Sequence, residues 1–114
     1  MLAKEYRFHR QNDVKRVYRS GESARSGPFG LKYLKQSKPG DSRVAVVVSK
    51  KVDKSAVVRN RIRRRIYEII RTHWESVKQG NDIVITVFNV SVEKEKHQEL
   101  EHRILKLLKS ADLV

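Results

Sequence analysis

Arginine and lysine are concentrated in one stretch of the sequence, Ser49 to Arg71, which reads SKKVDKSAVVRNRIRRRIYEIIR. The stretch holds nine of these cations against two acids, Asp53 and Glu68. A solvated helix face usually mixes both signs, because opposite charges four residues apart stabilise the helix. Guanidinium groups of one sign suit bidentate contacts with phosphates and stacking on bases instead. The stretch therefore predicts a surface that binds a polyanion, and nucleic acid is the expected one.

Apolar residues recur at helical spacing through this stretch and just beyond it: Ile62, Ile66, Ile69, Ile70, Trp74 and Val77. The spacing predicts a helix that starts at Ser55, is ended by Gly80-Asn81-Asp82 and buries this apolar face. A turn of about 100° per residue places Arg63 and Arg65 beside the apolar face. The same geometry points four residues away from it: Asn60, Arg61, Arg64 and Arg71. The helix is thus expected to pack inward and to present arginines outward.

Charge is distributed unevenly over the 114 residues, whose net charge is +13. Residues 1–49 and 50–71 each carry +7, whereas residues 72–114 carry −1. Self-repulsion of this size is usually offset by a polyanion, so the binding surface is expected within the first 71 residues. The length predicts a single domain spanning residues 1–114. No apolar run reaches the length of a membrane span and the N-terminus has no hydrophobic signal core, so a soluble, cytoplasmic protein is expected.

The other periodicities predict a small α+β fold. A short helix should run from Asn12 or Asp13 to Ser20 and end at Gly21. Strands are expected at residues 29–36, 43–50 and 83–88. Ser91 should cap a last helix, whose apolar face is Leu100, Ile104, Leu107 and Leu108. The fold class is therefore a single-domain α-β-β-α-β-α sandwich, with a central sheet packed by helices.

The first two predicted strands have distinct signals. Gly27-Pro28 precedes the strand at residues 29–36, and Pro39-Gly40-Asp41 is a turn signal that predicts antiparallel pairing with the strand at residues 43–50. The run from Val44 to Val48 is apolar on both faces, which is typical of a central strand.

Aromatic residues lie among cations in the N-terminal part: Tyr6, Phe8, Tyr18, Phe29 and Tyr33. Rings in a basic groove suit unpaired nucleotides, because every base has a π-face. The alternative is core packing, which is favoured for Phe29 and Trp74 and stays as open as stacking for Tyr18. No protein active site is expected, since cysteine is absent, no Asp/Glu pair forms an acid–base couple and the histidines lack metal-ligand spacing: His9, His73, His97 and His102.

Ser49-Lys50-Lys51 followed by an Arg59-Asn60-Arg61 helix closely resembles the signature of the bacterial ribonuclease P protein component family. The resemblance covers nearly the whole chain, because the segments 12–21 and 82–85 also fall in the family's order. It implies a protein subunit of ribonuclease P, the ribonucleoprotein endonuclease that removes the 5′ leader of precursor tRNA by hydrolysis. It also implies that catalysis belongs to the RNA with its Mg²⁺, and that the protein alone binds no cofactor and has no active site.

The resemblance assigns positions of this chain to two surfaces. The catalytic RNA would be bound by Lys50, Lys51, Arg59, Asn60, Arg61, Arg63, Arg64 and Arg65. The single-stranded leader would lie in a cleft between the first helix and the sheet, at Val14, Tyr18, Lys32 and Ser49. Many relatives have an aromatic residue at the position of Val14, so this chain has one stacking platform fewer. No membrane and no obligate protein partner is implied.

The family also implies a ribosomal-protein-like fold with a left-handed crossover, from the second strand through the basic helix to a parallel strand. Physical reasoning from the sequence would favour the right-handed connection, which is the overwhelming rule. The left-handed connection is therefore an expectation from the resemblance alone.

Three other functions stay open from the residues themselves. A double-stranded DNA binder would place the basic helix in a major groove, but no short helix precedes it as in a helix-turn-helix, and no dimerisation heptads are visible. A ribosomal or general RNA-chaperone protein would share the charge pattern. A membrane-surface helix would need the apolar face that the core requires.

Overall fold

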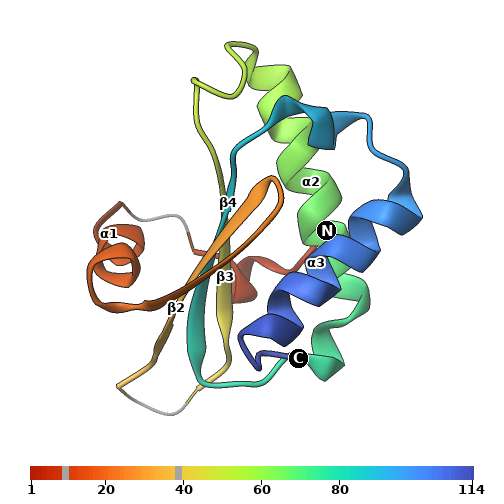
Figure 1. Ribbon diagram of the computed structural model, residues 1–114. Helices are drawn as coiled ribbons and strands as arrows, with labels where there is room; N and C mark the ends of the chain where they lie inside the picture. The colour runs from red at the N-terminus through yellow and green to blue at the C-terminus, as the bar shows by residue number, and fades with distance from the viewer. Residues whose placement is uncertain (9–10, 38–39) are drawn as a thin grey trace.

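The computed structural model describes residues 1–8, 11–37 and 40–114, and shows a four-stranded sheet packed by three helices (Figure 1). The elements in chain order are α1 (Gln11–Ser20), β1 (Glu22–Ser26), β2 (Phe29–Lys35), β3 (Arg43–Val48), α2 (Ala56–Thr72), β4 (Asn81–Val87) and α3 (His97–Ser110). Short 3₁₀ turns are η1 (Lys4–Tyr6), η2 (Trp74–Ser76) and η3 (Val90–Glu93). The predicted α+β class is confirmed, with one strand more than expected.

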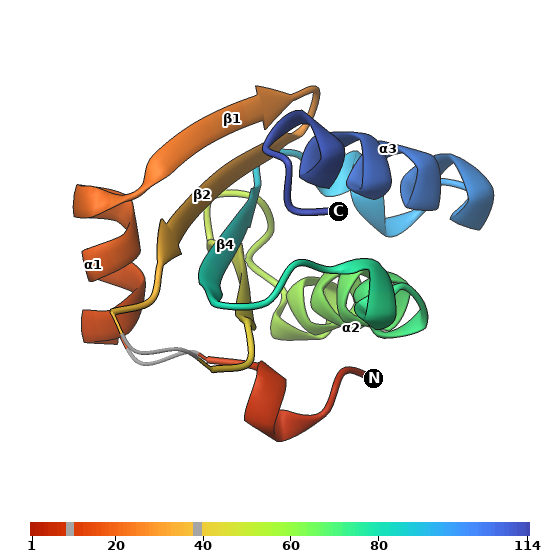
Figure 2. The same ribbon diagram turned by 90° about the horizontal axis from the view of Figure 1, so that it is seen from below.

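The strand order in the sheet is β1-β2-β4-β3, with β3 and β4 parallel and the other pairs antiparallel. In Figure 2, α1 covers one face of the sheet, and α2 and α3 cover the other. The chain runs up β3, down α2 on its right in Figure 1, and up β4, which lies in front of β3. This clockwise turn toward the viewer is a left-handed crossover. The connection implied by the resemblance is therefore present, against the usual right-handed rule.

β3 lies at the edge of the sheet and pairs with β4, so its predicted pairing with β2 and its predicted central position are wrong. Two covered faces explain its apolar run, because Val44 and Val46 belong to the cluster under α2 and Ala45 to a cluster beneath α1. The N-terminal segment covers part of its outer edge, where the Phe8 amide donates to the Val44 carbonyl at 3.1 Å. Burial on both faces thus does not require a central position. Pro39 of the predicted turn lies outside the described residues.

β1 was not expected, because it reads ESARS and lacks apolar alternation. It pairs with β2 in a hairpin in which Ser26 lies opposite Phe29. The linking residues are Gly27 and Pro28, and Gly27 has φ +55, which glycine adopts without strain. The Gly27-Pro28 pair therefore marks a hairpin turn as well as the start of a strand.

α2 begins as predicted but ends earlier. Ser55 Oγ accepts a hydrogen bond from the amide three residues later at 3.3 Å, so the predicted cap is confirmed. The helix ends at Thr72 and the chain continues as a 3₁₀ turn, from which Val77 and the partly buried Trp74 extend the apolar stripe. Trp74 is stacked on Tyr6 with ring centroids 4.7 Å apart. The apolar spacing therefore continues beyond the helix because the turn packs on the same core.

α3 begins at His97, so the prediction that Ser91 caps it is wrong. Ser91 lies in η3, where its amide donates to the Asn89 side chain at 2.8 Å. The Ser91 signal thus belongs to a separate short turn that precedes α3. The predicted apolar face of α3 is confirmed, because all four of its residues are buried.

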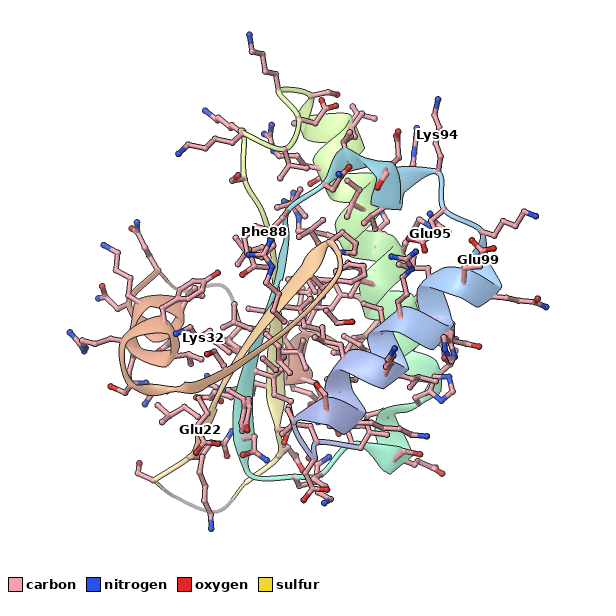
Figure 3. The ribbon with its side chains drawn as sticks, in the orientation of Figure 1. Glu22, Lys32, Phe88, Lys94, Glu95 and Glu99 are labelled. Atoms are coloured by element: carbon pink, nitrogen blue, oxygen red, sulfur yellow. The ribbon has the colours of Figure 1, made fainter. Side chains whose placement is uncertain are left out.

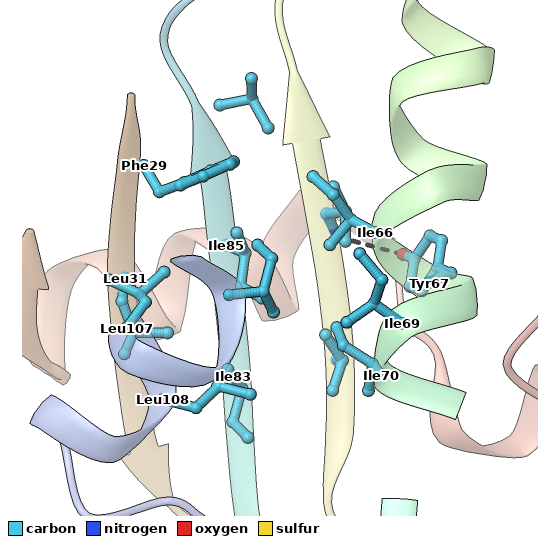
Figure 4. Close-up of a cluster of buried hydrophobic side chains, with 14 of the residues drawn as sticks. Phe29, Leu31, Ile66, Tyr67, Ile69, Ile70, Ile83, Ile85, Leu107 and Leu108 are labelled. Atoms are coloured by element: carbon cyan, nitrogen blue, oxygen red, sulfur yellow. Dashed lines mark hydrogen bonds between the residues drawn. The ribbon is translucent and has the colours of Figure 1, made fainter. Parts of the chain in front are cut away.

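Buried side chains form two clusters on the two faces of the sheet. The larger joins the sheet to α2 and α3 and includes Phe29, Leu31, Ile66, Ile69, Ile70, Ile83, Ile85, Leu107 and Leu108 (Figure 4). In it, the Tyr67 hydroxyl accepts a hydrogen bond from the Val46 amide at 3.0 Å. The smaller, beneath α1, consists of Phe8, Val17, Ala45 and Val84. Phe29 is fully buried, so the core prediction is confirmed for it.

Candidate nucleic-acid interface

The outward face of α2 presents its cations as the periodicity predicted. Asn60, Arg61, Arg64 and Arg71 are exposed, and Arg63 and Arg65 are half-buried. The only acid of α2 is Glu68, which pairs with Arg71 at 2.5 Å. Hydrogen bonds from Arg71 and then from the N-terminal amine lower the pKa of this carboxyl to about 2. The one acid of the helix is therefore committed to Arg71, and the other arginines of α2 have no acid on their own helix.

Arg59 holds the loop that leads into α2. Its Nη1 donates to the carbonyls of Asp53 and Lys54, both at 2.8 Å. The Asp53 carboxylate accepts in turn from the Ser55 amide at 2.8 Å. Lys50 and Lys51 are exposed in the turn just before this loop. Arg59 thus positions the loop behind the two lysines, and its Nη1 is occupied by the chain itself.

Two further arginines of α2 contact η3. Arg65 Nη1 donates to the carbonyls of Val92 and Glu93 at 2.6 and 2.8 Å, and Arg65 Nη2 donates to the carbonyl of Glu95. Arg61 forms an ion pair with the Glu93 carboxylate at 2.6 Å. Arg65 therefore fastens η3 to α2, while the largely exposed Arg61 is held, among the residues that the structure describes, by Glu93 alone. The arginines of α2 are thus not equivalent.

A groove of about 700 Å³ lies between the N-terminal segment, α1, β3 and α2. We call it the N-terminal groove; its lining includes Lys4, Arg7, Val14, Asn60, Arg63 and Arg64. It brings one predicted leader residue, Val14, beside three predicted RNA-binding residues of α2. Lys4 and Arg7 were not predicted as site residues. For Arg7 the sequence does hold a signal, its position between two aromatic residues.

Tyr18 and Lys32 come together on the α1 side of the sheet. The Tyr18 hydroxyl is hydrogen-bonded to Thr86 Oγ1 on β4, and Lys32 Nζ donates to the Tyr18 carbonyl at 3.3 Å. We call these three residues the tyrosine patch. Tyr18 is 36% exposed, so its ring is not part of the core. Val14 lies partly buried against the small cluster, and Ser49 is exposed directly after β3.

A buried carboxylate anchors α1 and therefore the tyrosine patch. Asp82 is 1% exposed and accepts from Arg16 of α1 at 2.6 Å, from Gln36 at 2.9 Å and from Arg43 at 3.0 and 2.9 Å. Burial alone would raise the pKa of Asp82, but the hydrogen bonds from Arg43 and Gln36 and the charge of Arg16 outweigh it and lower the pKa. The ionised carboxylate thus links α1 to three strand ends.

Two further properties bear on the kind of site. Within residues 1–8, 11–37 and 40–114, no three His, Asp or Glu side chains are grouped closely enough to hold a metal ion. His9, one of the four histidines, lies outside the described residues. No helix in the described part of the chain is long and apolar enough to cross a membrane.

Comparisons with known proteins match nearly the whole chain. The family described as Ribonuclease P matches residues 2–112. The Ribonuclease P protein component of Pseudanabaena sp. (strain PCC 6903) is 37% identical over 114 residues, covering 100% of this chain and 97% of that protein. The solved RNase P protein of Staphylococcus aureus has a TM-score of 0.83 at 25% identity, with 95% and 96% of the two chains covered. The RNase P protein from Thermotoga maritima has a TM-score of 0.80 at 25% identity, with 91% and 96% covered.

Proposed function

The chain belongs to the Ribonuclease P protein family, and from this premise we propose that it binds the catalytic RNA through α2 and holds the 5′ leader of precursor tRNA beside α1. In the holoenzyme the RNA and its Mg²⁺ supply the hydrolytic cleavage, and the protein supplies binding and positioning in the cytoplasm. The observation that carries the proposal is the N-terminal groove, where the basic face of α2 meets the α1 side of the sheet.

Docking on the catalytic RNA uses the cations that the fold leaves outward. Asn60, Arg63 and Arg64 line the groove, and Lys50 and Lys51 are exposed at the same end of α2. A helix holds these groups at fixed spacing, so little side-chain order is lost when guanidiniums meet phosphates in bidentate geometry. Each phosphate neutralised releases counterions, so affinity for the RNA is expected to fall steeply with salt.

The remaining predicted RNA-binding arginines take modified roles in this proposal. Arg59 contributes by fixing the lysine-bearing loop, and Arg65 by fixing η3, since both donate to main-chain carbonyls. Arg61 can reach RNA only by sharing or releasing its ion pair with Glu93. Arg63 donates to the Asn60 side chain beside it rather than to another segment, so Asn60, Arg63 and Arg64 are the main direct contacts in this proposal.

Leader binding uses the tyrosine patch and the groove next to it. The exposed ring of Tyr18 offers a π-face to an unpaired base, and the Lys32 ammonium offers a charge to its phosphate. Val14 lies on the same helix one turn before Tyr18 and lines the groove toward Arg63 and Arg64. The leader thus lies next to the docking surface, which places the cleavage point near the catalytic RNA.

Reconstitution tests this proposal directly. A bacterial ribonuclease P RNA is supplied with precursor tRNA at a magnesium concentration too low for the RNA alone, and leader release is followed with and without the protein. Strong stimulation is expected, together with tighter binding of precursor tRNA than of mature tRNA. Tight RNA binding without stimulation, with RNAs of two architectures, would instead indicate a general RNA-binding protein.

A further inference from the structure

Phe88 is an aromatic residue left exposed directly after β4. Its side chain is 49% exposed, and its amide donates to the Pro28 carbonyl at 2.8 Å. The ring lies against Gly30 of β2, where a Cβ would come within 2.8 Å of the ring atom Cε2. Gly30 therefore makes room for the ring, which is held against the strand with much of its surface open to solvent.

The Arg25 guanidinium lies over this ring. Its Cζ is 4.5 Å from the ring centroid of Phe88, within the range of a cation–π contact. Arg25 stands directly opposite Gly30 in the β1–β2 pair, so the short hairpin fixes the position from which it reaches the ring. Backbone hydrogen bonding thus fixes both partners: β1–β2 pairing positions Arg25, and the bond to the Pro28 carbonyl positions Phe88.

Phe88 lies on the same face of the sheet as the tyrosine patch. A Cβ on Gly30 would lie 3.9 Å from Thr86 Cβ, which places Gly30, Phe88 and Thr86 on one face. Thr86 is hydrogen-bonded to Tyr18. Figure 3 shows Lys32 beside α1 and Phe88 near the β1–β2 hairpin. Two exposed rings, Tyr18 and Phe88, therefore follow one another across this face, with Thr86 between them.

A polar pocket of about 400 Å³ adjoins the ring of Phe88. It is lined by Arg25, Gly27, Pro28, Phe88, Asn89, Ser91 and Arg103. Arg103 Nε pairs with Glu95 at 2.7 Å, while its Nη1 reaches the hairpin, where a Cβ on Gly27 would lie 3.3 Å from it. The pocket thus combines an aromatic surface with two guanidiniums and two small polar side chains, which is the chemistry that binds a nucleotide without duplex structure.

We propose that Phe88 and Arg25 form a stacking platform for one unpaired base of the 5′ leader, beyond the base at Tyr18, with Arg103 contacting the adjoining phosphate. This inference rests on the proposed function, because it takes the leader as the ligand. The platform supplies a second aromatic surface in a chain that has Val14 in α1. It also extends the leader track from α1 toward the hairpin and η3.

The test is an abasic scan of the leader in the reconstituted holoenzyme, with binding of precursor tRNA as the readout. In the wild type, one abasic position beyond the Tyr18 contact should weaken binding about tenfold, which lies within the range for loss of one stacked base. Phe88→Ala should weaken binding of the intact leader by a similar factor and remove the sensitivity to that abasic position. If the sensitivity persists in Phe88→Ala, the platform is overturned.

Matched variants separate stacking from packing. Phe88→Trp should keep the affinity, whereas Phe88→Leu fills the space over Gly30 without a π-face and should behave like Phe88→Ala. Wild-type affinity in Phe88→Leu would overturn the proposal, because the ring would then serve packing alone. Val90→Ala removes a neighbouring exposed apolar side chain and should change nothing. Melting temperatures verify that each variant is folded.

The phosphate contact has a separate readout. Arg103→Gln should reduce the dependence of log affinity on log salt by somewhat less than one unit for a leader that reaches the pocket. A leader too short to reach it should show no change; an equal change for both leaders would overturn the Arg103 contact. If the wild type itself does not distinguish precursor from mature tRNA, the proposed function has failed. If the wild type does so and the Phe88 variants match it, only this inference fails.

Discussion

The two faces of the sheet are covered to very different extents. α2 and α3 close one face with the larger cluster, whereas α1 and Phe8 close only part of the other with the smaller one. The rest of that second face carries Lys32, Thr86 and Phe88 in partly or largely exposed positions, with Tyr18 above them. Most of the buried apolar side chains therefore lie on one face of the sheet, and strand side chains on the other face remain accessible.

The largest expected effect contrasts core truncations on the two faces. Ile66→Ala, in the larger cluster, should lower the free energy of unfolding by about 4 kcal/mol, because three buried carbons are lost and a cavity remains. Val17→Ala, in the smaller cluster, should lower it by about 2 kcal/mol. Urea unfolding of the free protein measures both. Equal losses would mean that the two faces share the stability evenly.

The next effect concerns the charged anchor of the less covered face. Arg43→Ala removes two hydrogen bonds from the Asp82 carboxylate, which stays buried. We expect a loss of about 3 kcal/mol in the free energy of unfolding, since a buried charge is left with fewer partners. Lys35→Ala, on an exposed strand end nearby, serves as control and should stay within about 0.5 kcal/mol of the wild type.

The same anchor predicts a pH dependence. The pKa of Asp82 is lowered in the folded state, so its contribution is present above the ordinary aspartate pKa of about 4 and is lost as pH falls through the folded value. Arg43→Ala should bring that pKa back up. The stability difference between wild type and variant should therefore shrink on acidification below about pH 4. A difference that stays constant from pH 7 to pH 3 would contradict this assignment.

The next expected effect concerns the cations of α2, the helix that packs on the larger cluster. Arg63→Ala with Arg64→Ala should weaken binding of the catalytic RNA about tenfold or more and lower the salt slope by about 1.5 units, because two phosphate contacts are lost. Lys106→Ala with Lys109→Ala removes the same charge from exposed positions of α3. Affinities measured between low and physiological salt should show a clearly smaller change for the α3 pair.

The smallest effect concerns Tyr18 on the open face. Tyr18→Ala should weaken binding of leader-bearing precursor tRNA about fivefold and leave mature tRNA unchanged, because one stacked base loses its platform. Tyr18→Phe keeps the ring, loses only the hydrogen bond to Thr86, and should bind like the wild type. Equal losses for precursor and mature tRNA in Tyr18→Ala would remove Tyr18 from the leader contact.

The helices and their core residues could be predicted from the sequence where a helix buries a single apolar face. The isoleucines of α2 and the leucines of α3 are buried as predicted, since a single apolar stripe leaves little choice of orientation. The position of β3 could not be read, because burial on two faces is the same signal whether a strand lies at the centre or at a covered edge. β1 was missed because its residues pair through the backbone and carry no apolar alternation.

The candidate site, too, could be predicted only in part from the sequence. Exposure of Asn60, Arg61 and Arg64 follows from helical geometry, but the internal roles of Arg59 and Arg65 depend on main-chain carbonyls of other segments. Carbonyl acceptors leave no trace in side-chain identity, so no pattern could have distinguished these arginines. Which residues contact RNA stays a prediction for the whole set, and the contacts described above decide which variants test it best.

The backbone hydrogen bond from Phe8 to Val44 protects an edge of the sheet from pairing with a second copy of the protein. A sheet edge with free amides and carbonyls can add a strand from a second copy, and so invites aggregation. At β3 the N-terminal segment already occupies part of that edge. At the opposite edge, β1 is short and polar and includes two charged side chains. A truncation that removes the N-terminal segment should therefore expose the edge of β3 and lower the solubility of the free protein.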